Sequence, residues 1–194
     1  MSIDLSTVRL ALSKHRPVEV DEPGTFPAAV ALVLIDGPQG LETLFIERAE
    51  RADDPWSRQI AFPGGRRDPA DVDLFATAVR ETREETGVEL RTAERLGVLD
   101  DLYPRTPVLP PVVVRPFVFA LPALPRRPEV TPSDEVHAAF WVPLASLQAP
   151  GVHQVVTVTP RGMTLSVPAY ILGTHAIWGM TERILTPFLE LLGR

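Results

Sequence analysis

Apolar residues recur along this chain with two periods, and the period distinguishes expected strands from expected helices. Short apolar runs bounded by turn residues predict strands at 27–36, 41–48, 114–121 and 135–142. The first two runs flank the segment DGPQG, which predicts a turn and therefore a β-hairpin. A further hairpin that turns at 160–162 is expected over 153–170, and residues 58–65 predict a short strand that ends in two glycines.

Spacings of three and four residues predict helices in three other segments. The first is a short amphipathic helix at 5–14, and the last is a long closing helix at 175–192. The middle helix is expected over 72–86, with a stripe facing the core formed by Phe75, Ala78, Val79 and Thr82. Gly87 suits the left-handed conformation that closes many helices. Together these elements predict a mixed sheet flanked by helices, in the α/β (α+β) class, within one domain over 1–194.

Length and composition indicate an ordinary globular protein. The chain has 194 residues, of which 45% are hydrophobic and 23% are charged, which is enough for a sizeable core. Cysteine is absent, and this excludes disulfides, thiolate metal sites and thiol nucleophiles. No apolar run is long enough to span a bilayer, and the N-terminal segment lacks the features of a secretory signal. A cytoplasmic protein without membrane association is therefore expected.

Charge is distributed unevenly along the chain. The net charge of −6 argues against a nucleic-acid partner, because such binding needs a basic surface that releases counterions. One segment is nevertheless basic, with five arginines within twenty residues: Arg48, Arg51, Arg58, Arg66 and Arg67. Guanidinium groups match the geometry of phosphate oxygens. These arginines are therefore candidates for binding a phosphorylated small molecule.

An acidic cluster occupies the end of the expected middle helix. Glu81, Glu84 and Glu85 stand at positions i, i+3 and i+4 and therefore share one face. Carboxylates this close raise one another's pKa unless a positive charge lies among them. A divalent cation such as Mg²⁺ can supply that charge, and the preceding Gly64–Gly65 segment can offer a backbone carbonyl as a further ligand. The alternative is a solvated helix face held by surface pairs such as Arg80–Glu84.

The segment GGRRDPADVDLFATAVRETREETGV resembles the signature of the Nudix hydrolases, the Nudix box, which here covers 65–88. The residues that match its fixed positions are Gly65, Arg80, Glu81, Glu84, Glu85, Gly87 and Val88. Asp71 takes the place of the first glutamate, and eight residues instead of seven separate it from Arg80. Thr82 stands where an apolar residue is usual. The pattern is long and fixed in spacing, which makes it specific.

This resemblance implies a Nudix-type α/β/α sandwich that hydrolyses a nucleoside diphosphate linked to another group, with Mg²⁺ or Mn²⁺ as the cofactor. Glu81 and Glu85 would be the principal metal ligands, and Glu84 and the Gly64 carbonyl would contribute. Arg80 would orient the glutamates through its guanidinium group.

The general base of such a reaction is left open. Glu84 can act through a metal-bound water, but the family often takes its base from a later loop, where Glu135 and Asp134 stand. Both acids fit equally well a structural role at the end of a loop that precedes a strand.

A second stretch, at 47–65, resembles the segment that precedes the box in the coenzyme A diphosphatase subfamily. The matching residues are Arg48, Ala49, Gln59, Ile60, Ala61 and the FPGG sequence, whereas Trp56 and Arg58 replace the usual histidine and glycine. The segments at 135–144 and 177–185 also resemble this subfamily, so the resemblance covers about residues 27–192.

The subfamily resemblance implies cleavage of coenzyme A to adenosine 3′,5′-bisphosphate and 4′-phosphopantetheine. Gln59, Phe62 and the five arginines would bind the substrate, with Phe62 or Trp56 stacking on adenine. An aromatic residue beside Pro-Gly-Gly also fits a core position. The four histidines show no ligand spacing and are expected to be structural.

The replacements at 56 and 58 keep open a second substrate class, ADP-ribose or another nucleoside diphosphate derivative. A noncatalytic Nudix-like binding domain is a third possibility, although such a domain has no need for three mutually repelling carboxylates. The sequence does not indicate an oligomeric state.

Overall fold

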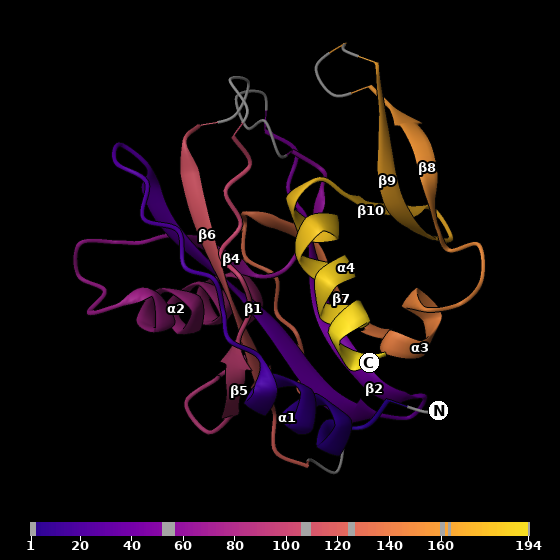
Figure 1. Ribbon diagram of the computed structural model, residues 1–194, viewed down its shortest axis with the longest axis horizontal. Coiled ribbons are helices and arrows are strands. Elements are labelled where there is room, and N and C mark those ends of the chain that lie inside the picture. Colours follow the sequence, from indigo (N-terminus) through magenta and orange to yellow (C-terminus); the bar gives the residue numbers. More distant parts are fainter. Residues whose placement is uncertain are drawn as a thin grey trace.

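The computed structural model describes residues 3–51, 57–105, 110–123, 127–159, 162 and 164–193 (Figure 1). Its helices are α1 (Leu5–Lys14), α2 (Leu74–Thr86), α3 (Leu144–Leu147) and α4 (Met180–Leu192). The strands of the main sheet are β1 (Phe26–Gly37), β2 (Gly40–Arg48), β3 (Ile60–Ala61), β4 (Gly64–Arg66), β5 (Glu94–Val98), β6 (Val112–Ala120) and β7 (Val136–Pro143). A smaller sheet contains β8 (His153–Val158), β9 (Leu165–Leu172) and β10 (His175–Trp178).

The main sheet is mixed, as the sequence predicts. Its strands follow the order β3-β2-β1-β6-β5, with β4 also paired to β1 and β7 also paired to β2. Strands β1 and β6 run parallel, whereas β1 and β2 form the predicted antiparallel hairpin. The long crossover from β1 to its neighbour β6 leaves room for α2 to cover the sheet.

Strand β1 is buried on both faces, and its alternate residues belong to two separate cores. On one face Leu32 and Leu34 pack in the core that α1 and α4 cover. On the other face Val33 and Ile35 pack in the core beneath α2. This two-sided burial explains why β1 reads as an almost continuous apolar run. The predicted α/β/α class, with a central mixed sheet between helices, is confirmed.

Helix α2 has defined signals at both ends. The Asp73 side chain accepts a hydrogen bond from the Ala76 N–H at 2.7 Å, so the helix begins at Leu74 and not at Val72. Gly87 closes the helix with φ of 71°, and its N–H donates to the Arg83 carbonyl. These two caps fix which turn of the helix carries the glutamates.

The smaller sheet packs against α4 through a polar network. The His153 Nε2 atom lies 2.9 Å from Glu182 Oε1, which also accepts a hydrogen bond from Thr186. Tyr170 joins Thr186 at 2.8 Å, and its ring stacks on that of His153. The β8–β9 pair projects from the rest of the molecule, and β10 leads from it into α4 (Figure 1).

The prediction of one closing helix over 175–192 is wrong in its first turn. Residues His175–Trp178 form β10, which pairs with β9, and the helix begins at Met180. Gly179 separates the two with φ of 71°, a value that interrupts both strand and helix. The glycines at 64 and 65 also form a strand of their own, β4, and do not merely end the preceding one.

Two elements, β5 and α3, are absent from the sequence prediction, since each is short and partly exposed. The predicted β8–β9 hairpin is present, but residues 160 and 161 of its turn lie outside the described residues. No helix in the described part of the chain is long and apolar enough to cross a membrane.

Candidate active site

A cavity of about 310 Å³ lies where β1, β4 and α2 meet the beginning of α4. We call it the α2 cavity. Its floor is apolar and comes from β1 and β6, including Val112 and Val114. The charged residues in its wall are Arg48, Arg66, Glu81, Glu85 and Glu135. Acidic and basic side chains far apart in sequence therefore face one space.

Glu85 is the most deeply buried of the clustered acids, with an exposed fraction of 4%. Its Oε2 accepts a hydrogen bond from the Gly64 N–H at 2.8 Å, and Arg48 Nη1 lies 3.9 Å from Oε1. Burial raises the pKa of Glu85 to about 8, and the neighbouring charges of Glu81 and Glu135 act in the same direction, against Gly64 and Arg48. The local positive charge thus offsets only part of the effect of burial on this carboxyl group.

Glu81 lies against the second glycine of the pair. A side-chain carbon added to Gly65 would lie 2.5 Å from the carboxyl carbon of Glu81, so glycine is needed for this close approach. Burial raises the pKa of Glu81, while the Arg80 guanidinium, 2.9 Å away, lowers it. The two glycines therefore have distinct tasks, since Gly64 contacts Glu85 through its N–H and Gly65 makes room for Glu81.

Arg80 forms hydrogen bonds with Asp71, Glu81 and Glu84. Its Nε and Nη2 atoms form a bidentate pair with Asp71 at 3.0 and 2.9 Å. Its Nη1 atom donates to Glu81 and to Glu84, each at 2.9 Å. A single guanidinium group thus orients two glutamates and is itself held by a buried aspartate.

Asp71 is buried and accepts further hydrogen bonds from the Thr77 hydroxyl at 2.9 Å and from the Asp68 N–H at 3.0 Å. The hydrogen bonds from Arg80 hold the pKa of this carboxyl far below its usual range. Eight residues separate Asp71 from Arg80, one more than in the Nudix signature, and Asp71 nevertheless pairs with Arg80.

The two candidate bases in the later loop lie in different surroundings. Glu135 lines the α2 cavity, and Arg51 Nη1 lies 3.2 Å from its carboxylate. Asp134 is not among the described residues that line this cavity. The loop is attached to the end of α2, because the Ser133 N–H donates to the Glu85 carbonyl at 3.2 Å and the Thr131 N–H to the Thr86 carbonyl at 2.9 Å.

Two of the five clustered arginines line the α2 cavity. They are Arg48 and Arg66, and the guanidinium of Arg66 also lies 4.8 Å from the centre of the Phe26 ring. Arg58 pairs with Glu47 at 3.1 Å. Arg67 donates to the backbone carbonyls of Asp71 and Val72 and holds the loop before α2.

Gln59 and Phe62 both belong to the cavity wall, but the Phe62 ring is 2% exposed. It stacks on Phe45, with ring centres 4.9 Å apart. Phe62 is thus a core side chain in this structure, in agreement with the alternative expectation for it. Trp56 lies outside the described residues.

The donor groups fit a divalent cation in their chemistry. In the described residues, no three acidic or histidine side chains stand ready to hold a metal ion together. Arg80 holds Glu81 and Glu84, and Gly64 holds Glu85. Burial, with a smaller contribution from neighbouring carboxylates, raises the pKa of both Glu81 and Glu85, and a hard cation that accepts oxygen ligands would favour their ionised forms.

Sequence reasoning missed the contribution of α4 and β6. Met180, Thr181 and Ile184 of α4 line the α2 cavity together with Val112 and Val114 of β6. These are ordinary core-type residues, and no local pattern distinguishes them. Their role comes from the packing of α4 over the sheet.

Comparison with protein families and sequences identifies relatives over most of the chain. Residues 25–161 match the NUDIX domain. The mitochondrial coenzyme A diphosphatase NUDT8 of Homo sapiens is 34% identical over 173 residues, which cover 88% of this chain and 70% of that protein. NUDT8 of Mus musculus is 32% identical over 88% of this chain and 79% of its own length. The uncharacterized Nudix hydrolase NudL of Salmonella paratyphi B is 35% identical over 66% of this chain and 63% of its own length.

Solved structures share the fold at lower sequence identity. A MutT/nudix family protein from Enterococcus faecalis aligns with a TM-score of 0.58 and 18% identity over 99% of this chain and 71% of its own. The NUDIX domain of Shewanella oneidensis NrtR, complexed with ADP ribose, aligns with a TM-score of 0.51 and 22% identity over 73% of this chain and 86% of its own. The glutamates, the two arginines and the glycines that line the α2 cavity lie within the matched domain, and the chain belongs to the Nudix hydrolase family.

Proposed function

We propose that this Nudix hydrolase is a divalent-metal-dependent coenzyme A diphosphatase. It would cleave coenzyme A or its derivatives to adenosine 3′,5′-bisphosphate and 4′-phosphopantetheine. The observation that carries this proposal is the convergence of Glu81, Glu85 and Glu135 with Arg48 and Arg66 around one cavity. The similarity to NUDT8, whose name states this activity, supports the choice of substrate.

The acidic residues would hold the metal. Glu81 and Glu85 are the proposed principal ligands, and Glu84 and the Gly64 carbonyl are the proposed further ligands. Mg²⁺ or Mn²⁺ bound there would neutralise diphosphate charge and lower the pKa of a bound water. Arg80 is anchored on Asp71 and would keep the glutamate carboxylates oriented.

Glu135 is the proposed general base. It lines the α2 cavity together with Glu81 and Glu85, and its negative charge contributes to the raised pKa of both. Glu84 is half-exposed and paired with Arg80, and it is not among the described residues of the cavity wall. Arg51 Nη1 lies 3.2 Å from the Glu135 carboxylate and would hold this acid in position to accept a proton from water.

Arg48 and Arg66 are the proposed contacts for the diphosphate oxygens. They line the cavity that the glutamates also line, so a diphosphate held by them lies next to the acids. Arg51, Arg58 and Gln59 follow on the same stretch of chain and are the proposed contacts for the phosphorylated nucleoside.

An assay of the purified protein tests this proposal. The protein is incubated with Mg²⁺ or Mn²⁺ and coenzyme A, ADP-ribose or deoxynucleoside triphosphates, and the products are separated. Adenosine 3′,5′-bisphosphate from coenzyme A is the expected result. AMP from ADP-ribose alone would favour the second substrate class, which the residues at 56 and 58 keep open. No product from any substrate would indicate a noncatalytic binding domain.

A pair of variants tests the assignment of the glutamates. Glu85→Gln removes a proposed metal ligand and is expected to lower kcat at least 100-fold without loss of the fold. Glu89→Gln makes the same chemical change at a half-exposed residue of the neighbouring turn and serves as the control. Equal activity of both variants would contradict the assignment.

A further inference from the structure

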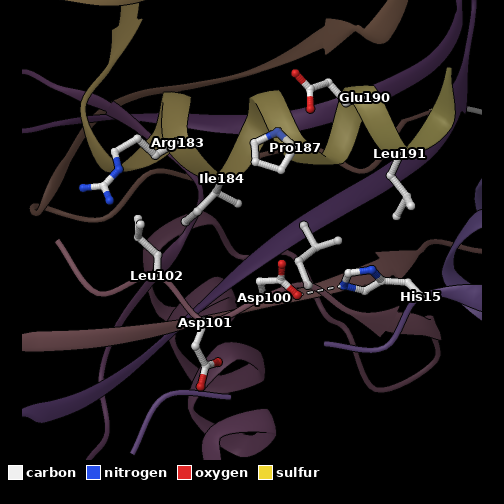
Figure 2. A pocket seen from close by; sticks show the side chains of 10 residues that line it. His15, Asp100, Asp101, Leu102, Arg183, Ile184, Pro187, Glu190 and Leu191 are labelled. Atoms are coloured by element: carbon white, nitrogen blue, oxygen red, sulfur yellow. Dashed lines mark ion pairs between the residues drawn. The ribbon is translucent and has the colours of Figure 1, made fainter. Parts of the chain in front are cut away.

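A second cavity of about 190 Å³ lies between α4 and the segment that follows β5 (Figure 2). We call it the α4 cavity. Its apolar residues are Leu99, Leu102, Ile184, Pro187 and Leu191. Its polar residues are His15, Asp100, Asp101, Arg183 and Glu190. Among the described residues, neither the Nudix box nor the segment before it contributes to this cavity.

The α4 cavity continues the α2 cavity along the same two walls. On the helix, Ile184 borders both cavities, and Met180, Ile184, Pro187 and Leu191 lie at spacings of four, three and four on one helix face. On the opposite wall, Leu102 of the α4 cavity exchanges two backbone hydrogen bonds with Val114 of the α2 cavity, at 2.8 and 2.9 Å. One side chain, Ile184, thus stands between the two spaces.

The size of the α2 cavity argues that the substrate extends beyond it. Its 310 Å³ lies at the lower limit of ligand sites, which enclose about 300–1,000 Å³. Coenzyme A carries a large group on each side of its diphosphate. With the diphosphate at the glutamates, one of these groups has to leave the α2 cavity, and the α4 cavity adjoins it.

Charge selects which end of the substrate fits the α4 cavity. Three of its polar residues are acidic, and the two basic ones include His15, which lies 3.2 Å from Asp100. Asp101 pairs with Arg115 at 2.8 Å, so two carboxylates, Asp100 and Glu190, and one guanidinium, Arg183, are left to face an incoming group. A lining with more carboxylates than guanidinium groups disfavours the phosphorylated nucleoside, but it accepts the uncharged pantetheine chain with its amides and apolar carbons.

A polar anchor for such a chain is present at the end of the α4 cavity. The buried Nε2 atom of His15 has no hydrogen-bond partner among the described residues, because its approach to Asp100 lacks hydrogen-bond geometry. An amide group of a bound chain could supply the missing partner, which removes the cost of leaving this atom unpaired. The apolar side chains beside it would bury the methylene groups.

We infer that the α4 cavity is the subsite for the uncharged arm of the substrate, that is, for pantetheine or an acylated pantetheine. This inference rests on the proposed coenzyme A diphosphatase function. The arm enters past Ile184, while the diphosphate stays with Arg48 and Arg66 in the α2 cavity and the phosphorylated nucleoside lies toward Arg51, Arg58 and Gln59. His15 and Leu191 are then residues that determine specificity and take no part in bond cleavage.

Filling the cavity tests the subsite by kinetics. Leu191→Phe places a larger side chain in the α4 cavity and is expected to lower kcat/KM for coenzyme A about tenfold, since two or so methylene groups of the arm lose their burial. Val155→Phe adds the same ring at a residue that is 70% exposed on β8, outside both cavities, and is the control. Equal kcat/KM values for the two variants would contradict the subsite.

A binding experiment separates failure of the subsite from failure of the proposed reaction. The imidazole signals of His15, assigned with His15→Gln, are followed by NMR while pantetheine or adenosine 3′,5′-bisphosphate is added. We expect pantetheine to shift them and the bisphosphate to leave them unchanged. A response to the bisphosphate alone, or to neither compound, would overturn the subsite. If His15 responds to pantetheine but coenzyme A is not cleaved, the subsite stands and the proposed reaction fails.

Discussion

At the scale of single residues, Arg58 combines backbone strain with an ion pair. Its φ of 61° places a side chain in the left-handed region, which costs about 1 kcal/mol for a residue other than glycine. The coenzyme A diphosphatase segment that it resembles has glycine at this position. The pair with the nearly buried Glu47 at 3.1 Å offsets the strain here.

Two substitutions at Arg58 separate strain from pairing. Arg58→Ala keeps the strained backbone and loses the pair, whereas Arg58→Gly loses the pair but relieves the strain. We therefore expect the free energy of unfolding, measured with urea, to be about 1 kcal/mol lower for the alanine variant than for the glycine variant. If the glycine variant were the less stable of the two, the strain argument would be wrong.

Glu85 makes the stability of the metal-free protein depend on pH. Its pKa in the folded state is about 8 because of burial, compared with 4.5 for an ordinary glutamate. Between these values the folded state binds more protons than the unfolded state, so stability falls as pH rises through this window, by up to about 1.4 kcal/mol per pH unit.

Glu85→Gln removes this titration. In EDTA, the variant should be more stable than the parent at pH 8, and the difference should shrink toward pH 5. Urea unfolding of both proteins at pH 5, 6.5 and 8 measures it. A difference that does not change with pH would show that the Glu85 carboxyl is not held in its protonated form.

At the scale of elements, β4 fixes how α2 meets the sheet. A side-chain carbon on Gly64 would lie 2.2 Å from the Ala29 carbonyl oxygen, which is backbone and cannot move aside. The same carbon on Gly65 would meet the carboxyl end of Glu81, which can rotate away. Gly64 is therefore required for the packing of the backbone, whereas Gly65 leaves room for the carboxyl group of Glu81.

Gly64→Ala should therefore affect mainly stability, and Gly65→Ala should affect mainly activity. Gly64→Ala is expected to lower the free energy of unfolding by about 3 kcal/mol or more, because its φ of 154° is also unfavourable for alanine. Gly65→Ala should stay within about 1 kcal/mol of the parent but lose most of its activity. Thermal unfolding and an assay of coenzyme A cleavage distinguish them, and the reverse order of stability would refute this division.

The sequence predicted elements well where local signals were strong. The β1–β2 hairpin, the α2 helix with its Gly87 cap, and the β8–β9 pairing follow from turn residues and apolar periods. The closing helix was predicted too long because HAIW fits either period, and its pairing with β9 is a tertiary contact. The short β5 strand has little apolar pattern, and its place beside β6 decides its conformation.

Prediction of the site was limited in the same way, because local sequence patterns do not show which distant segments pack together. The glutamates, Arg80 and the glycines follow from spacing and resemblance, and the structure brings them together. Which arginines face the α2 cavity, and the part of Met180 and Ile184 in its wall, depend on how distant segments pack. No periodicity within a single segment encodes such information.

At the scale of the whole molecule, the small sheet contacts the main sheet directly, through the stacked rings of Phe140 and His175, and is also held by α4. Glu182 is buried and binds Thr186 and His153, so its removal leaves His153 without this partner and Thr186 with only its bond to Tyr170. We expect Glu182→Ala to lower the free energy of unfolding by about 2 kcal/mol and to speed hydrogen exchange in β8 and β9.

The exposed Gln154 on β8 provides the control for this experiment, and Gln154→Ala should change neither quantity. Hydrogen–deuterium exchange with mass spectrometry gives the regional readout. Unchanged exchange in β8 and β9 of the Glu182 variant would mean that contacts other than this network hold the small sheet in place.

The loop that carries Glu135 is fastened by its backbone to the last turn of α2. Such bonds do not depend on side-chain identity, so the proposed base and the proposed metal ligands should keep their mutual distance under most substitutions nearby. Recognition of the substrate's far end, by contrast, depends on side chains of α4 that can be exchanged one at a time. Substitutions on one face of α4 could therefore change which substrates this enzyme accepts, while the residues at the glutamates stay unchanged.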